Sequence, residues 1–370
     1  MTEARQPVPL NDLSRGIARD AAAMLDATRR VFESGYVVQG PEHALFEKEL
    51  AAYLAVEHAI GLASGTDALE LAMKAAMPPG RSTIVTAANA GGYSTTAARR
   101  AGFTVSYADV DEDSLCLDVN ALDGVLTDDV GVVVVTHLYG LLTDIDDLLA
   151  LCRDRGVRVL EDCAQSIGAR RGSRMAGTWG DIAAISFYPT KNLGAMGDGG
   201  AVVTSNGGLA ARVRQLRQYG WDEKYHVELQ GGVNSRLDEL QAAYLRLRLP
   251  QLDGFNERRR EIVSRYGRAA TRVDRALLQI LPADGPQHVA HLAVGRSTKR
   301  DDVRRQLLDL GVRTDVHFPV PDYDQPGFAV QRVTLPVTSR VSGEVLSLPC
   351  FPEMTEQEID DVCAAIGALR

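Results

Sequence analysis

Residues 157–165 read Val157-Arg158-Val159-Leu160-Glu161-Asp162-Cys163-Ala164-Gln165, and they give the clearest indication of the fold. The first five residues, Val157–Glu161, form a short run rich in apolar and β-branched side chains, which predicts a buried strand. Runs of the same kind recur on both sides of it from about residue 60 to 205, separated by segments with helical periodicity. Continuous apolar strands that alternate with helices are typical of a mostly parallel sheet with helices on both faces.

Ligands of such sheets bind at the carboxyl ends of the strands, so the residues that follow each strand are the candidates for function. The other predicted strands are Thr83–Thr86, Phe103–Tyr107, Val132–Thr136, Ala183–Phe187 and Ala201–Thr204. The helices predicted between them include Ala68–Ala76, Ile145–Arg155 and Leu209–Gln218.

The C-terminal third has a different pattern, which predicts a smaller α+β domain. One helix is expected to begin at Ser235, with Ser235 and Asp238 resembling a capping box, and to stop at Pro250. The elements expected after it are an Arg-rich helix at Gly254–Arg268, strands at Val289–Val294 and Val312–His317, and helices at Arg300–Leu310 and Thr355–Leu369. We therefore predict a large domain over residues 1–252, including an N-terminal arm, and a small domain over residues 253–370.

Composition excludes several classes of protein. Of the 370 residues, 45% are hydrophobic and 24% charged, which excludes bulk disorder, and the net charge of −9 argues against a nucleic-acid-binding protein. No run reaches the roughly 18 apolar residues of a membrane helix, and the N-terminus lacks an apolar signal core. The five cysteines are scattered without CxxC spacing, which indicates a reducing cytoplasm, and neither they nor the seven histidines predict a metal site.

Three short segments carry candidate chemistry. The first is Ala63-Ser64-Gly65-Thr66-Asp67-Ala68-Leu69, a small turn that runs directly into an amphipathic helix. The free backbone amides at such a helix start suit a phosphate group, although an ordinary capped helix has the same pattern.

The second segment is the pair of acids, Glu161 and Asp162, that closes the apolar strand. A carboxylate buried at this point is costly without a cationic partner, and the protonated nitrogen of a pyridine ring is one such partner. An acid that is exposed or caps the next turn is the alternative.

The third segment runs from Ile185-Ser186-Phe187-Tyr188-Pro189-Thr190-Lys191-Asn192 to the glycine cluster Gly197–Gly200. Lys191 follows a predicted strand end in a loop stiffened by Pro189, where partial desolvation favours the neutral amine that a Schiff base needs. A solvated cation is the alternative for any single lysine. The glycine cluster does not open a long helix, so it does not predict a dinucleotide site.

Together these segments resemble the pyridoxal-phosphate (PLP)-dependent sugar aminotransferases of the DegT/DnrJ/EryC1/StrS family, a branch of the aspartate aminotransferase fold (fold type I). The resemblance covers nearly the whole chain. It is carried by ASGTDAL from Ala63, HLYG from His137, EDCAQ from Glu161, SFYPTKNLGAMGDGG from Ser186, GGVNSRLDELQAA from Gly231, HFPVP from His317 and LSLPCFPEMT from Leu346. It implies a mostly parallel sheet of the seven-stranded type in the large domain.

The resemblance also implies roles for particular residues. Lys191 would form the Schiff base with PLP and then move the proton between the substrate carbon and the cofactor's C4′. Asp162 would pair with the pyridinium nitrogen, so that the ring can act as an electron sink. Gln165 would lie near the ring's phenolic oxygen. The phosphate would be held by Gly65, Thr66, Ser186 and, from the neighbouring subunit, Asn234, which makes a homodimer with shared active sites the expected assembly.

One segment departs from the family's pattern. Many relatives carry an aromatic that stacks on the cofactor in a Pro-x-Thr-aromatic context, whereas this chain has Ala88-Asn89-Ala90-Gly91-Gly92-Tyr93-Ser94. Tyr93 is the candidate stacking residue, and a core or surface tyrosine is the alternative. His137, His317 and Arg236 are left without assigned roles, since a structural histidine or an ion pair explains each equally well.

The resemblance implies a cytoplasmic transaminase that transfers an amino group from an amino acid, glutamate or glutamine, to a keto sugar linked to a nucleotide. The NSRLDELQAA form of the motif resembles enzymes of 3-keto-deoxysugars more than those of 4-keto sugars. Two alternatives stay open: a sugar dehydratase that uses the pyridoxamine or pyridoxal cofactor, against which the presence of Lys191 argues, and a cofactor-binding regulatory protein without turnover.

Overall fold

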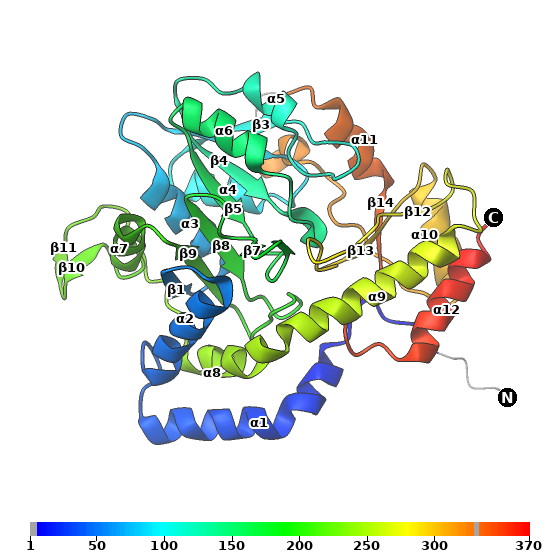
Figure 1. The fold of residues 1–370 in the computed structure, drawn as a ribbon, viewed down its shortest axis with the longest axis horizontal. Coiled ribbons are helices and arrows are strands. Elements are labelled where there is room, and N and C mark those ends of the chain that lie inside the picture. The colour runs from blue at the N-terminus through cyan, green and yellow to red at the C-terminus, as the bar shows by residue number, and fades with distance from the viewer. Residues whose placement is uncertain (1–5, 329–332) are drawn as a thin grey trace.

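The computed structural model describes residues 6–328 and 333–370, and its centre is a seven-stranded sheet (Figure 1). The strand order is β1 (His58–Leu62), β9 (Gly200–Thr204), β8 (Ile182–Ser186), β5 (Arg158–Asp162), β4 (Val130–Thr136), β2 (Thr83–Ala87) and β3 (Thr104–Ala108). In this sheet β9 runs antiparallel to both of its neighbours, and the other pairings are parallel. The predicted mostly parallel sheet is confirmed; β1 is the strand that the sequence pattern did not single out.

Helices cover both faces of this sheet because its strands are apolar on both sides. In β4, Val132 and Val134 pack into a core with α3 (Gly65–Ala76), α4 (Tyr93–Arg100) and α7 (Gly207–Leu216). The alternate side chains, Val133 and Val135, pack with α5 (Val119–Asp123) and α6 (Asp146–Asp154). On this second face α2 (Pro41–Leu54) and α8 (Glu239–Arg248) cover β8 and β9.

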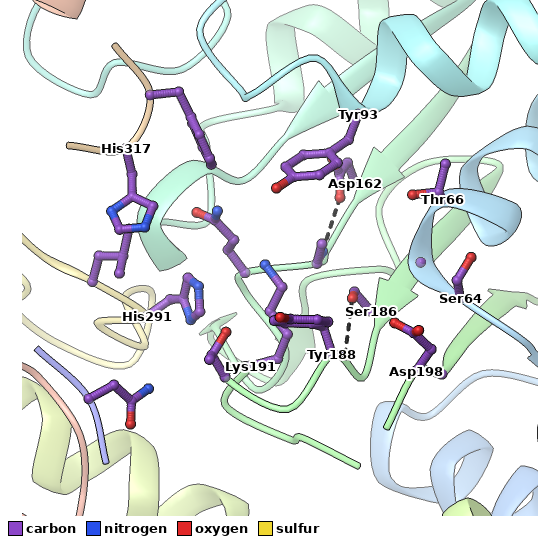
Figure 2. Close-up of a pocket in the computed structure, with 18 of the residues that line it drawn as sticks. Ser64, Thr66, Tyr93, Asp162, Ser186, Tyr188, Lys191, Asp198, His291 and His317 are labelled. Atoms are coloured by element: carbon purple, nitrogen blue, oxygen red, sulfur yellow. Dashed lines mark hydrogen bonds between the residues drawn. The ribbon is translucent and has the colours of Figure 1, made fainter. Parts of the chain in front are cut away.

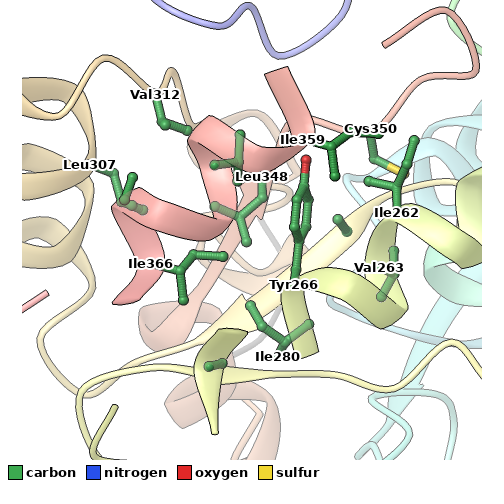
Figure 3. Close-up of a cluster of buried hydrophobic side chains, with 14 of the residues drawn as sticks. Ile262, Val263, Tyr266, Ile280, Leu307, Val312, Leu348, Cys350, Ile359 and Ile366 are labelled. Carbon is green, nitrogen blue, oxygen red and sulfur yellow. The ribbon is translucent and has the colours of Figure 1, made fainter. Parts of the chain in front are cut away.

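The C-terminal part has a core of its own, built on the long helix α9 (Leu252–Ala270). Its antiparallel sheet has the order β12 (Gln279–Ile280), β13 (Ala293–Arg296), β14 (Val345–Leu348), and its helices are α10 (Arg300–Asp309), α11 (Pro336–Glu344) and α12 (Glu356–Gly367). Tyr266 is fully buried there, and its hydroxyl donates to the carbonyl of Pro349 at 3.0 Å (Figure 3). The predicted α+β character is present, and the division at residues 252 and 253 stays a prediction.

Three predicted elements were wrong in position or kind. Helix α8 begins at Glu239 with Asp238 as its N-cap, and the hydroxyl of Ser235 instead accepts from the amide of Ala63 at 3.1 Å and donates to Asp67 at 2.8 Å. The stretch 312–317 forms no ladder, because Val312 and Asp315 each make a single bridge, to Val8 and Ser347. The strand predicted at 289–294 lies at Ala293–Arg296, because the backbone leaves the extended conformation at Ala290, whose φ is +46°.

The remaining elements lie at the periphery. Helix α1 (Leu13–Ser34) forms the N-terminal arm and packs on α8 through Ala27 and Val31. Two small hairpins, β6 (Arg170–Arg171) with β7 (Arg174–Met175) and β10 (Trp221–Glu223) with β11 (His226–Val227), lie outside the main sheet, and the second projects from the body (Figure 1). In the part of the chain that the structure describes, no helix combines the length and hydrophobicity that a membrane span requires.

Candidate active site

A cavity of about 550 Å³ opens at the carboxyl ends of β5 and β8 (Figure 2). Seven of the eight residues predicted to form the site line it, and they come from four separate segments of the chain. These residues are Gly65, Thr66, Tyr93, Asp162, Gln165, Ser186 and Lys191. The eighth, Asn234, does not line this cavity.

Lys191 lies in the loop that follows β8, and its side chain points into the cavity (Figure 2). Its backbone amide donates to the carbonyl of Tyr188 at 2.8 Å, which fixes the turn. Burial lowers the pKa of its amine to about 8, against the opposing effect of the Asp162 carboxylate. About a tenth of the amine is therefore neutral, and nucleophilic, at pH 7, far more than for an exposed lysine.

Asp162 is the last residue of β5 and is buried. Its carboxylate accepts hydrogen bonds from the hydroxyl of Thr136 at 3.2 Å and from the amide of Ala164 at 3.0 Å. Burial nevertheless raises its pKa, so the ionised carboxylate would gain stability from a cation placed beside it.

The neighbouring acid, Glu161, has a different role. It is fully buried and accepts hydrogen bonds from the amides of Gly177, Trp179 and Gly180 at 2.6–2.8 Å and from His137 Nε2 at 2.9 Å. His137 Nδ1 accepts from the amide of Thr143 at 3.2 Å. Glu161 and His137 are thus structural, which answers the question that the sequence left open for this histidine.

The start of helix α3 forms a cradle next to Ser186. The Ser64 side chain caps the helix by accepting from the amide of Asp67 at 3.1 Å, and Gly65 and Thr66 follow it as the first helical residues. A Cβ added to Gly65 would lie 2.6 Å from the Cβ of Ser186. Only glycine permits this close approach of the residue 65 backbone to Ser186. The backbone amides at the helix start and the Ser186 hydroxyl therefore surround one small space of the size of an anion.

Gln165 and Tyr93 line the same cavity. The Oε1 atom of Gln165 accepts from the amide of Tyr139 at 2.7 Å, which holds its side chain in place. Tyr93, at the start of α4, is 50% exposed, and its ring packs edge-on against Phe318 with centroids 6.0 Å apart. A half-exposed aromatic ring on a cavity wall is available to stack on a planar ligand.

The two glycines that distinguish the Tyr93 loop are required by its neighbours. Gly91 and Gly92 have φ angles of +81° and +76°, and a Cβ added to either would approach the ring of Phe318 or Phe328 to 2.8 or 3.0 Å. The loop is also tied to Asp322, which accepts from Thr95 Oγ1 at 2.5 Å, while Thr95 Oγ1 lies 3.1 Å from the Tyr107 hydroxyl. The C-terminal segment after His317 thus holds this loop in place.

Asp322 provides a test of that contact. Burial raises its pKa to about 6, although the Thr95 hydroxyl and the Gly92 amide favour its charged form. Because the folded-state pKa exceeds that of the unfolded chain, the charged side chain destabilises the fold above pH 6, and this cost disappears as the pH falls towards 4. We expect Asp322→Asn to raise the free energy of unfolding at pH 8 by up to about 3 kcal/mol. In denaturant titrations this gain in the free energy of unfolding should be smaller at pH 5. The control is Asp324→Asn, at an exposed position of the same segment, which should leave the free energy of unfolding nearly unchanged at both pH values.

Asn234 lies in an adjacent depression together with Ser64, Asp198 and Arg236. It is exposed, and its backbone forms a bridge with Gln218 near the β10–β11 hairpin. Arg236 is partly buried in the same depression. Both side chains are therefore available to a second molecule.

Three further cavity residues lie on segments far from β5 and β8 in the chain. His317 and Phe318 line the cavity from the segment after α10, and His291 lines it from the residues before β13. Sequence reasoning left His317 unassigned and did not single out His291. A single histidine in an apolar run has no spacing signal, so only the folded chain identifies it.

Comparisons with known proteins agree with this geometry. The family model described as the DegT/DnrJ/EryC1/StrS aminotransferase family matches residues 19–367. A dTDP-3-amino-3,4,6-trideoxy-alpha-D-glucose transaminase from Micromonospora megalomicea subsp. nigra is 38% identical, with 94% of this chain and 95% of that protein covered.

Two solved structures have the same fold. DesV from S. venezuelae, in complex with a ketimine intermediate, has a TM-score of 0.93 and 36% identity over 98% of both chains. NtdA from Bacillus subtilis, with bound cofactor PMP, has a TM-score of 0.91 and 27% identity over 99% of this chain and 85% of its own. The resemblance found in the sequence is therefore confirmed.

Proposed function

The chain belongs to the DegT/DnrJ/EryC1/StrS aminotransferase family, and from that premise we propose that it is a PLP-dependent sugar transaminase. It takes an amino group from an amino acid, glutamate in the first instance, and transfers it to a nucleotide-linked 3-keto-deoxysugar. The observation that carries the proposal is that Lys191 and Asp162 share one cavity with the phosphate-sized cradle at Gly65 and Ser186.

The residues fit PLP on chemical grounds. The cradle of backbone amides and the Ser186 hydroxyl suit the phosphate. Asp162 is a carboxylate whose pKa is raised by burial, and a protonated ring nitrogen beside it would favour its charged form. Lys191 has the lowered pKa that Schiff-base chemistry needs. Gln165 would lie beside the ring's phenolic oxygen, and Tyr93 would stack on the ring.

When bound, the cofactor supplies an electron sink for the bonds at the substrate carbon. The chain supplies the remaining functions. Asp162, held by Thr136 and Ala164, keeps its negative charge in place for the ring nitrogen. Lys191 is the group that accepts the proton from the donor carbon and returns it, since it is the amine inside the cavity.

The substrate assignment rests on two supports. The relative from Micromonospora is named for a 3-amino sugar, and the DesV complex covers almost the whole of this chain. Tyr93 and the segment at His317–Phe318 line the same cavity as Lys191, and we place the sugar against them. We also propose the reducing cytoplasm as the compartment, with which five free cysteines agree.

A two-stage assay tests this function. Glutamate alone should change the visible absorbance of the cofactor-loaded protein and release 2-oxoglutarate. A panel of nucleotide-linked 3-keto and 4-keto sugars should then restore the absorbance only with a sugar that becomes aminated, as detected by mass spectrometry. Release of a dehydrated sugar would instead establish the dehydratase, and binding of the cofactor without either reaction would establish the regulatory protein.

We further propose a homodimer in which Asn234 of one chain completes the phosphate site of the other. In support, Asn234 is exposed and lies outside its own chain's main cavity. One charge-assisted hydrogen bond to a phosphate contributes about 1.5–3 kcal/mol, so Asn234→Ala should lower cofactor affinity by about 10- to 150-fold.

Mixed dimers test this arrangement directly. In a dimer of a Lys191→Ala chain and an Asn234→Ala chain, a shared site combines the intact Lys191 of one chain with the intact Asn234 of the other. We expect about half of the sites in each purified heterodimer to be active, at limiting cofactor. Activity that stays at the mean of the two parent variants, with subunit exchange verified by mass spectrometry, would place Asn234 in its own chain's site.

A further inference from the structure

A second cavity, of about 210 Å³, lies between the N-terminal arm and the loop that carries Lys191. Helix α9 and the segment that follows β14 complete its walls, and we call it the arm cavity. It shares Asn11, Thr190 and Lys191 with the active-site cavity, so the two spaces adjoin. Apart from Lys191, none of the residues proposed to hold PLP lines it.

Arg259 of α9 lies in the wall of the arm cavity and is buried without a carboxylate partner. It is 4% exposed, and its Nη1 donates to the carbonyls of His291 at 3.1 Å and Cys350 at 2.6 Å. Among the described residues no carboxylate lies within ion-pairing distance of its guanidinium. Buried arginines are normally paired, because an uncompensated buried charge destabilises the fold.

The nitrogens of Arg259 that remain free form the edge that suits a carboxylate. Nε is enclosed and has no acceptor, and Nη2 has none either among residues 6–328 and 333–370. The N–H bonds of Nε and Nη2 run parallel along one edge of a guanidinium, where they can bind both oxygens of one carboxylate. Arg217 is buried to a similar extent, at 8%, but the fold places Glu47 at 2.6 Å from its Nη1.

The acids that line the arm cavity do not neutralise the buried guanidinium of α9. Asp12 lies 3.0 Å from Arg15, and Glu353 lies 2.9 Å from Arg19, so each is already paired with an arginine of α1. Arg248 lines the cavity as a second cation. An anion that enters the cavity would therefore meet free positive charge.

The rest of the lining favours a ligand with a hydrocarbon part. Ile17, Phe255 and Phe351 present apolar side chains from the arm, α9 and the segment after β14. At roughly 30 Å³ per water the cavity has room for about seven waters, so a four-carbon acid fits. Apolar walls gain from burying methylene groups, which a phosphate or a chloride ion does not carry.

We propose that the arm cavity is a binding site for a short aliphatic carboxylate. Its two oxygens accept hydrogen bonds from Nε and Nη2 of Arg259, and its hydrocarbon part lies against Ile17, Phe255 and Phe351. The occupant then lies next to the loop that carries Lys191.

A pair of isosteric ligands tests the site in the full-length, cofactor-loaded protein. Butyrate should bind with one-to-one stoichiometry in a titration followed by NMR, and butyramide, which has the same shape without the charge, should bind at least about tenfold more weakly. Arg259→Gln should weaken butyrate binding by about 10- to 150-fold. No binding of butyrate, equal binding of butyramide, or an unchanged affinity in folded Arg259→Gln protein would overturn the proposal.

The neighbouring arginine supplies the matched control. Arg258 pairs with Glu261 at 2.6 Å and Glu356 at 2.5 Å and does not line the arm cavity. Arg258→Gln should therefore leave the affinity for butyrate unchanged, and a loss equal to that in Arg259→Gln would count against a specific site.

A second variant keeps the test valid if Arg259→Gln fails to fold. Ile17 is 38% exposed on α1, so Ile17→Trp adds bulk to the cavity wall without a change in the core. It should weaken butyrate binding by about tenfold or more, whereas Ala18→Trp, at the next and exposed position outside the cavity, should not. Equal affinities in the two tryptophan variants would contradict binding in the arm cavity.

Two sources share this ligand chemistry. One is the amino-acid donor, whose carboxylate would enter from the active-site cavity past Asn11, and this source rests on the proposed function. The other is a separate small acid. If the donor is the source, Arg259→Gln should raise the KM for glutamate by the same factor as the Kd for butyrate; if the acid is separate, that KM should stay unchanged. A protein without transaminase activity would refute the proposed function and leave the butyrate test intact.

Discussion

Lys191→Ala protein should lose the reaction with glutamate almost completely, by about 10²–10⁴-fold or more, because the variant removes the group that carries the proton. Borohydride should also no longer attach the cofactor covalently to the variant. Borohydride reduction of the loaded native protein is expected to fix the cofactor to the peptide that contains Lys191, and reduction of the variant should leave all peptides unmodified.

The control is Lys191→Arg, which keeps a positive charge in the cavity but cannot form the Schiff base. It should bind the cofactor but show neither the reaction with glutamate nor covalent attachment after reduction. A variant that had lost its fold would not bind the cofactor at all. Peptide mapping that finds the cofactor on another lysine in native protein would refute the assignment.

Asp162→Asn is expected to have the second large effect. The substitution keeps the shape and one acceptor but removes the charge that stabilises a protonated ring nitrogen. Each pKa unit lost at that nitrogen corresponds to about 1.4 kcal/mol, or tenfold in rate, so a loss of two to three units slows proton removal from the donor carbon by about 10²–10³-fold. The measurement is the single-turnover rate with glutamate.

A cofactor analogue separates charge from packing in this experiment. PLP methylated at the ring nitrogen keeps its positive charge without a proton, so it should recover part of the lost rate in Asp162→Asn protein. Single-turnover rates close to those of the native protein with ordinary PLP, or no response to the methylated analogue in a variant that binds it, would contradict the role of Asp162.

The Tyr93 loop is where this chain and the usual pattern of its family diverge. Its two glycines admit the rings of Phe318 and Phe328, so the C-terminal segment packs directly against the loop. Because Phe318 and His317 also line the cavity, this contact couples the loop to the wall that would face the sugar. The divergence is therefore a candidate for the determinant of substrate choice, which the panel of keto sugars examines.

Local patterns were sufficient to predict the parallel sheet and the placement of Lys191 and Asp162 at its carboxyl edge. Strand β4 is apolar at every position from Val132 to Val135, and this pattern is local, so burial on both faces follows without knowledge of distant residues. The placement of Lys191 and Asp162 in one cavity followed from the rule that parallel strands present their carboxyl ends together. The family motifs strengthened both inferences.

The partners that polar side chains find far away in the chain could be identified only in the folded molecule. Ser235 has the local pattern of a helix cap, yet its hydroxyl bonds to Asp67 and Ala63, and the helix begins four residues later. Glu161 and Asp162 are adjacent and equivalent in the sequence, but one is enclosed by three loop amides and His137 while the other faces the cavity. His291 Nδ1 lies 2.9 Å from Oδ1 of Asn192, which is 99 residues away in the chain and meets it only after folding. Hydrogen bonds across long sequence separations have no periodicity, so their partners appear only when the chain is packed.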